Sequence, residues 1–82
     1  LGGEEFVVLC RQSSRDGGMA AAENLRAAIA ANDFAGVDPI TASFGVAGNR
    51  DGDTVESLLG RADAALYRAK ANGRNRVEVE ID

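Results

Sequence analysis

The sequence contains no histidine and no tryptophan, and its single cysteine is Cys10. One cysteine cannot form an intrachain disulfide, and the cysteine and histidine spacings typical of zinc sites are absent. Because no histidine is present to activate it, Cys10 is interpreted as a small core residue of the apolar run at residues 6–10, not as a nucleophile. These absences fit a reducing compartment, and we expect a cytoplasmic protein.

The chain also lacks a signal peptide and any apolar segment long enough to span a membrane. Its net charge of −4 argues against a broad basic surface for nucleic acid. Aromatic residues make up 5% of the chain, and alanine supplies much of the 45% that is hydrophobic, so we expect a thin core. The 82 residues suffice for one small domain or part of one.

Hydrophobic patterning predicts the order strand, helix, strand, helix, strand, without internal repeats or linkers. The apolar run at residues 6–10 is typical of a strand that is covered on both faces and central in its sheet. Residues 11–18 are polar and glycine-bearing, which indicates a loop. Residues 19–31 have helical periodicity, and that helix is expected to pack on the sheet.

The two later strands differ in their faces. Residues 40–47 alternate between larger apolar residues and small ones, and residues 77–82 alternate between aliphatic and acidic ones. A face of small residues admits either a closely packed helix or a ligand, and the helix is the favoured interpretation. The last strand is expected to be half-exposed, with an acidic outer face of Glu78, Glu80 and Asp82.

The second helix is expected to begin with Asp53 as its N-cap and to run to about Asn72. Glu56 lies three residues after Asp53, as in a capping box, and Gly73 supplies a stop signal. Its apolar face is predicted to consist of Val55, Leu58, Leu59, Ala62, Leu66 and Ala69.

Two glycines followed by two acids open the chain, at Gly2, Gly3, Glu4 and Glu5. Such glycines permit a tight turn and close approach of a ligand to the backbone, while the carboxylates can face a metal or a phosphate-bearing substrate. An ordinary hairpin turn is the alternative, and these residues alone favour it. Successive strand side chains point to opposite faces, so one glutamate only should enter a given site.

Cations gather toward the end of the chain. Lys70 and Arg74, four residues apart around the end of the second helix, can project in a similar direction. Such a cluster suits a phosphate-bearing small molecule, although cations at a helix end are also favoured by the helix dipole alone. Five of the nine cations lie between residues 61 and 76, namely Arg61, Arg68, Lys70, Arg74 and Arg76.

Three segments together resemble the GGDEF domain of diguanylate cyclases: the Gly-Gly-Glu-Glu-Phe opening, residues 43–47 and residues 62–77. The resemblance extends over residues 1–82 and matches the C-terminal half of the domain, so the N-terminal half is expected to be absent. It implies an α/β (α+β) fold: a β-α-β-α-β half of a nucleotidyl-cyclase-like domain, with a central, mostly antiparallel sheet flanked by helices.

The resemblance further implies condensation of two GTP into cyclic di-GMP with release of pyrophosphate. Glu4 would coordinate Mg²⁺ or Mn²⁺ and act as the base for the ribose 3′-hydroxyl, and Glu5 would be a secondary contact or a further, structural metal ligand. Gly2 and Gly3 would bring the backbone close to the substrate.

In the same resemblance, Lys70 and Arg74 of the Ala-Lys-x-x-Gly-Arg pattern hold the terminal phosphate of GTP. Asn75 is expected to tie down its loop and Arg76 to lie on the surface. Tyr67 is interpreted as a core or interface residue, not as a base.

The reaction needs two GTP-loaded domains, so a homodimer with a second GGDEF domain is implied, together with an upstream sensory or regulatory domain. The residues that read guanine and a second metal-binding aspartate belong to the other half of the family's domain, and the 82-residue chain alone is therefore expected to be inactive. The alternatives are a non-catalytic GTP-sensing or effector-docking module and a purely structural fragment.

Overall fold

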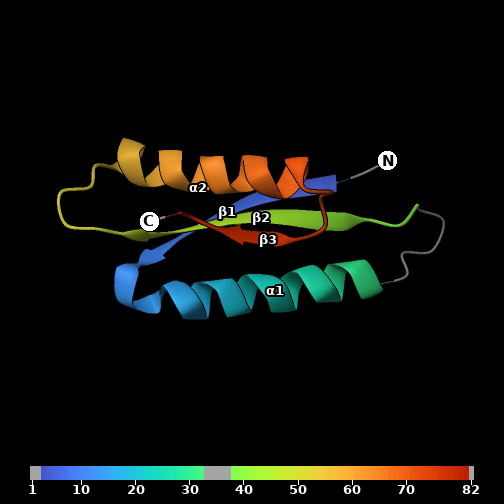
Figure 1. Cartoon of the computed structure of the whole chain (residues 1–82). Helices are drawn as coiled ribbons and strands as arrows, with labels where there is room; N and C mark the ends of the chain where they lie inside the picture. The colour runs from blue at the N-terminus through green and yellow to red at the C-terminus, as the bar shows by residue number, and fades with distance from the viewer. Residues whose placement is uncertain (1–2, 33–37, 82) are drawn as a thin grey trace.

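The computed structural model describes residues 3–32 and 38–81. A three-stranded sheet with the strand order β1-β2-β3 lies between helix α1 on one face and helix α2 on the other (Figure 1). None of the helices in these two segments is long and apolar enough to cross a membrane. In chain order the elements are β1 (Gly3–Arg11), the 3-10 turn η1 (Gln12–Ser14), α1 (Arg15–Ala31), β2 (Thr41–Asn49), α2 (Val55–Ala71) and β3 (Val77–Val79).

Both strand pairings are parallel. The mixed α/β class is confirmed, but the expectation of a mostly antiparallel sheet is wrong for the part of the chain that the structure describes. A helix follows β1 and another follows β2, and each returns the chain to the end of the sheet where the preceding strand began. Such helical crossovers make adjacent strands parallel.

The central strand is β2, not β1 as the apolar run at residues 6–10 had indicated. Residues 42–48 of β2 are buried, whereas Phe6 and Leu9 of β1 are 41% and 43% exposed. In the described segments β1 pairs with β2 only and forms an edge of the sheet. A continuous apolar run indicates that both faces of a strand are covered by helices. It does not indicate whether both hydrogen-bonding edges of the strand are paired.

The two faces of β2 pack differently. Ala42, Phe44 and Val46 form the core with Ala22 of α1, and the Phe44 ring stacks on Phe6 with a centroid distance of 5.2 Å. On the other face, a Cβ added to Gly45 would collide with the backbone of α2 at Ala62 and Leu66. The helix-packing interpretation of the small-residue face is therefore confirmed at Gly45. Opposite it, α2 buries small residues, Ala62, Ala65 and Ala69.

The connection expected at residues 11–18 is confirmed only for residues 12–14, which form η1, because helix α1 already begins at Arg15. Its first turn contains Gly17 and Gly18, which have low helix propensity. A Cβ on Gly18 would lie 3.3 Å from the Cys10 sulfur, so the glycine lets this turn pack tightly against β1. Tertiary contact here prevails over local propensity.

Helix α2 is capped by Thr54, not by Asp53 as expected. Thr54 Oγ1 accepts a hydrogen bond from the Ser57 amide, and Ser57 Oγ accepts one from the Thr54 amide. Its apolar face is also narrower than predicted, because Val55 and Leu59 are exposed. Val55 lies in the first turn of the helix, away from Ala62, Ala65 and Ala69, which are the residues that α2 buries.

Candidate functional site

Residues 3–5 of the Gly-Gly-Glu-Glu motif and the end of α2 meet at the amino-terminal end of β1. Glu5 Oε1 accepts a hydrogen bond from Lys70 Nζ at 3.2 Å, and Arg74 Nη1 lies 3.6 Å from Glu5 Oε2. The same Arg74 nitrogen is 3.8 Å from the position that a Cβ would occupy on Gly3. The fold thus brings together residues that are 65 or more positions apart in the sequence.

This cluster borders an open groove of about 670 Å³. The groove lies where the amino ends of β1 and β2 meet the turn that follows α2. Backbone without side-chain bulk at Gly3 and Gly73 contributes to it, and its cationic lining comes from Arg74. The other lining residues are Glu5, Pro39, Thr41 and Asn75.

The turn after α2 is left-handed over three residues: φ is 120° at Gly73, 62° at Arg74 and 50° at Asn75. Residues other than glycine adopt this region at an energetic cost and need contacts to hold them there. The Arg74 amide donates to the Ala69 carbonyl at 2.9 Å, and the Asn75 amide donates to Ser43 Oγ at 3.1 Å. These bonds fix the backbone that carries the Arg74 side chain.

The expectation that Asn75 ties down this loop is confirmed. Besides the bond from its amide to Ser43, Asn75 Oδ1 accepts a hydrogen bond of 2.8 Å from Arg26 Nη1. Arg26 lies on α1, on the far side of the sheet from α2 (Figure 1). Sequence reasoning missed Arg26, because no local pattern connects a mid-helix arginine to a turn 49 positions later.

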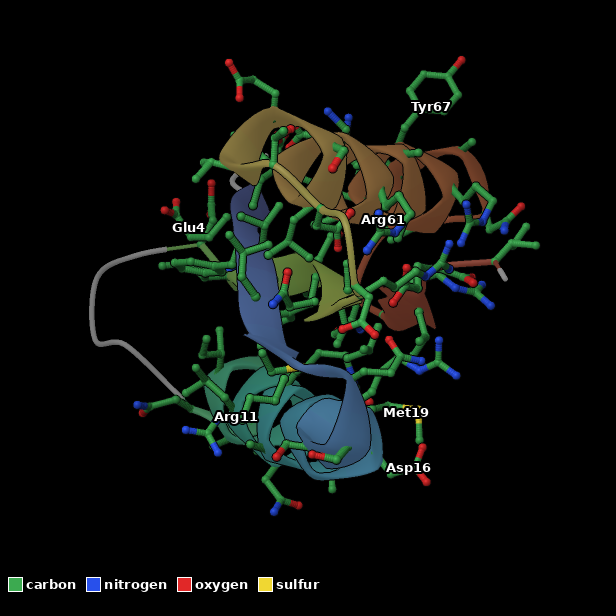
Figure 2. All side chains as sticks on the ribbon, turned by 90° about the vertical axis from the view of Figure 1, so that its left-hand side faces the viewer. Glu4, Arg11, Asp16, Met19, Arg61 and Tyr67 are labelled. Carbon is green, nitrogen blue, oxygen red and sulfur yellow. The ribbon has the colours of Figure 1, made fainter. Side chains whose placement is uncertain are left out.

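The remaining predicted residues are placed less favourably for one site. Strand alternation puts Glu4 on the opposite face of β1 from Glu5, and Glu4 projects away from the sheet in Figure 2. Gly2 lies outside the described residues. Tyr67 is 70% exposed and points outward from α2 (Figure 2), so it is not a core residue.

Only two of the five clustered cations reach the cluster around Glu5. Arg68 donates to the Val79 carbonyl, and Arg76 pairs with Glu78 on the surface, as expected of it. Arg61 is committed to Asp53 and Glu80. Five cations lie close together in the sequence, but only Lys70 and Arg74 contribute positive charge next to Glu5.

Metal ligands are few. Residues 3–32 and 38–81 contain no group of three or more histidine, cysteine, aspartate or glutamate side chains that could hold a metal ion. Glu4 is exposed and has no ion pair with the described residues, whereas Glu5 is engaged by Lys70 and Arg74. A carboxylate suits hard cations such as Mg²⁺, so the donor chemistry of Glu4 fits, and this part of the chain supplies only a fraction of a full ligand set.

A buried charge cluster, which the alternating pattern of the last strand did not reveal, lies around Glu80. The acidic outer face expected there is wrong for Glu80, which is 6% exposed. Its Oε1 accepts from Arg61 Nε at 2.5 Å and Arg50 Nη2 at 3.0 Å, and its Oε2 from the Gly48 amide at 2.6 Å. Arg15 lies 3.4 Å from the same carboxylate. The side chain of Glu80, the residue that follows β3, is thus bound by groups from α1, β2 and α2.

The surroundings lower the pKa of both carboxyl groups in this cluster, Asp53 and Glu80. Hydrogen bonds from Arg61, then from the Arg50 amide and Ser57, hold the pKa of Asp53 well below its usual value. Burial by itself raises the pKa of Glu80, but the Gly48 amide, Arg61 and Arg50 outweigh it, so that pKa is lowered. Both groups are therefore carboxylates at neutral pH.

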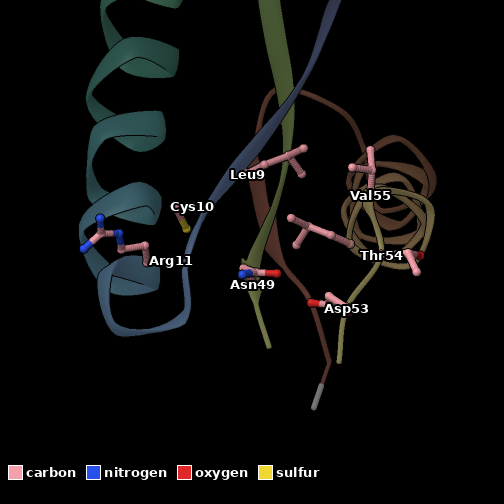
Figure 3. A pocket seen from close by; sticks show the side chains of 8 residues that line it. Leu9, Cys10, Arg11, Asn49, Asp53, Thr54 and Val55 are labelled. Atoms are coloured by element: carbon pink, nitrogen blue, oxygen red, sulfur yellow. The ribbon is translucent and has the colours of Figure 1, made fainter. Parts of the chain in front are cut away.

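A second groove, of about 510 Å³, lies at the other end of β1 between the strand and the start of α2 (Figure 3). It is lined by Leu9, Cys10, Val55 and neighbouring residues. Burial, and to a lesser degree Glu80, raises the pKa of the Cys10 thiol. This agrees with the interpretation that Cys10 is not a nucleophile.

Comparison with known proteins gives a consistent family. The chain matches the family model described as the GGDEF domain of diguanylate cyclases over residues 1–76. It is 42% identical to diguanylate cyclase DgcM of Escherichia coli K12, over 93% of this chain and 18% of DgcM. It is 48% identical to diguanylate cyclase DgcP of Pseudomonas aeruginosa, over 96% of the chain and 12% of DgcP. For the response regulator PleD of Caulobacter vibrioides the identity is 39%, over 93% of the chain and 18% of PleD.

The chain therefore spans less than a fifth of the length of each of these relatives. The comparison with solved structures found no match.

Proposed function

Because the chain belongs to the GGDEF domain family of diguanylate cyclases, we propose that it is the C-terminal half of such a domain and takes part in making cyclic di-GMP. The reaction joins two GTP molecules: each ribose 3′-hydroxyl attacks the α-phosphorus of the other nucleotide, and pyrophosphate leaves. The N-terminal half of the domain would supply guanine recognition and a further metal-binding carboxylate.

The observation that carries this proposal is the convergence of Lys70 and Arg74 on Glu5, next to Gly3. In the free protein the two cations share one carboxylate. On binding GTP they would exchange Glu5 for the terminal phosphate, whose oxygens accept charge-assisted hydrogen bonds from an ammonium and a guanidinium. Gly2 and Gly3 would let the triphosphate approach the backbone.

Glu4 is assigned as the catalytic residue. It would accept the proton of the 3′-hydroxyl and hold Mg²⁺ or Mn²⁺, whereas Glu5, which the pleat places on the opposite face of β1, is left out of this metal site. The metal, when bound, lowers the cost of forming an alkoxide beside a polyphosphate.

The stoichiometry requires a second GTP-loaded GGDEF domain, so the active form is a homodimer, with GTP as its substrate. A sensory or regulatory domain upstream would control the pairing, in a cytoplasmic protein without nucleic-acid partners. The 82-residue chain alone holds half a site and is inactive. The alternative is a GGDEF-like module that binds GTP or docks an effector without catalysis; the unaltered Gly-Gly-Glu-Glu-Phe motif favours the enzyme.

The deciding experiment compares GTP and GMP binding in the full-length protein. If Lys70 and Arg74 hold the terminal phosphate, Lys70→Ala and Arg74→Ala each weaken GTP binding by about 1 to 3 kcal/mol, the range of charged hydrogen bonds, and leave GMP binding nearly unchanged. Arg76→Ala is the matched control, because Arg76 pairs with Glu78 and lies away from Glu5. Equal losses for GTP and GMP would assign the pair to the helix dipole instead.

A further inference from the structure

Arg26 on α1 contacts the turn at residues 73–75, which follows α2 and carries Arg74, from the other side of the sheet. Its Nη1 donates to Asn75 Oδ1 at 2.8 Å. Its Nε and Nη2 form a two-pronged contact with Glu23, at 2.9 and 2.6 Å. The guanidinium is thus held by Glu23 on its own helix and aimed at Asn75, and its side chain is only 19% exposed.

The left-handed turn needs such support. Neither Arg74 nor Asn75 is a glycine, and both have positive φ. Three bonds from three elements hold them there: the Ala69 carbonyl of α2, the Ser43 hydroxyl of β2 and the Arg26 guanidinium of α1. Only the Arg26 bond reaches the Asn75 side chain, and it ties the orientation of the turn to the position of α1.

Because Arg74 directly precedes Asn75, the rotation of this turn sets the direction of the Arg74 guanidinium toward Gly3 and Glu5. We propose that Arg26 is a positioning residue for the phosphate-binding pair Lys70 and Arg74. Through its hydrogen bond to Asn75, Arg26 holds the left-handed turn that presents the Arg74 side chain. This inference rests on the proposed function of Lys70 and Arg74, and it assigns to α1 a part in substrate binding.

The test uses the full-length protein and inorganic tripolyphosphate as the probe, with affinity measured by titration calorimetry. Arg26→Met keeps the length and helix propensity of the side chain and removes its donors. Asn75→Gly keeps the left-handed backbone accessible and removes Oδ1. Arg76→Met is the control for loss of one cation near the turn, since the Arg76 guanidinium bonds to the Asn72 carbonyl and to Glu78, not to the Asn75 side chain.

We expect Arg26→Met and Asn75→Gly each to weaken tripolyphosphate binding about 2- to 10-fold, the range that one hydrogen bond supports, and Arg76→Met to have a smaller effect. The double variant should lose no more than the stronger single one, because both break the same bond. The KM for GTP should rise in the same proportion, with GMP affinity unchanged and with the unfolding midpoints of the variants close to that of the parent.

Separate results overturn separate claims. If Arg74→Ala weakens tripolyphosphate binding and Arg26→Met does not, Arg26 has no positioning role, and the assignment of Lys70 and Arg74 to the phosphate is unaffected. A full additional loss from Arg26→Met in the Asn75→Gly background would show a direct charge effect and overturn the route through Asn75. If Arg26→Met does not fold, unchanged affinity in Asn75→Gly overturns the inference. If Arg74→Ala binds tripolyphosphate as tightly as the parent, the proposed phosphate binding by Lys70 and Arg74, on which the inference rests, is overturned.

Discussion

Glu5 is bound in the free protein by the two cations that we assign to the terminal phosphate. All three side chains are partly exposed, and exposed ion pairs contribute about 0 to 1 kcal/mol each. A triphosphate offers more charge and more acceptor oxygens than one carboxylate, so it can displace Glu5 at little cost. Until then, Glu5 keeps the two cations close together despite their mutual repulsion.

Glu4 lies on the other face of β1 and has no ion pair in the described part of the chain. If it removes the 3′-hydroxyl proton and holds metal, Glu4→Gln in the full-length protein should lower kcat on the order of a hundredfold or more, because the amide cannot accept the proton and is an uncharged, weaker metal ligand. The measurement is cyclic di-GMP formation at equal folded fraction. Activity near that of the parent would reduce Glu4 to a residue of the turn.

Glu80 should make folding stability depend on pH. Its pKa in the folded chain is below the unfolded value of 4.5, so its stabilising contribution is present above that value and is lost as pH falls toward the folded-state pKa. Glu80→Gln should cost about 3 kcal/mol at pH 7, since it removes a buried carboxylate and leaves its partly buried arginine donors unpaired, and less at pH 3 to 4.

Urea unfolding of the chain at both pH values checks this prediction. Glu78→Gln is the control, because Glu78 pairs with the exposed Arg76. A Glu80→Gln variant as stable as the Glu78→Gln variant at pH 7 would show that the buried cluster contributes no net stability.

At the scale of elements, the contact between α2 and β2 depends on small residues on both sides. Gly45→Ala places a methyl group against the backbone at Ala62 and Leu66, and overpacking of this kind should lower the free energy of unfolding by about 1 to 3 kcal/mol or more. The same substitution at Gly60, which is exposed in α2 with open space around it, should raise it by about 0.5 to 1 kcal/mol.

Chemical denaturation of the two glycine variants measures both effects with identical chemistry. Opposite signs are expected. A stabilising Gly45→Ala would mean that α2 can move away from β2 freely, and the site at its end, which includes Lys70 and Arg74, would then lack a rigid support.

At the scale of the molecule, the outer edge of β1 is unpaired within the described residues and carries exposed Phe6 and Leu9. Apolar edges invite pairing with further strands, so we expect the 82-residue chain to self-associate at high concentration. Leu9→Lys should reduce this association, while Leu25→Lys, a similarly exposed position on α1, should not.

Sedimentation of the parent and the two lysine variants measures this association. A monomeric parent, with fast hydrogen exchange along the outer edge of β1, would contradict the prediction and the view of the chain as half a domain.

The sequence by itself determined the order of elements and the family, because hydrophobic period and short motifs are local properties. It also identified Lys70 and Arg74 as a pair, since their spacing brings them together around the end of one helix. It indicated correctly that Glu4 and Glu5 diverge, which follows from the pleat of a strand.

Only the tertiary structure decided which strand is central, that the sheet is parallel and that Glu80 is buried. Each of these depends on what an element packs against. Helix crossovers set the strand direction, and the start of α1, the residue after β2 and the second turn of α2 deliver Arg15, Arg50 and Arg61 to Glu80. The link from Arg26 to Asn75 is of the same kind: two residues 49 positions apart meet because α1 and the turn after α2 reach the same end of the sheet, and no local pattern encodes that distance.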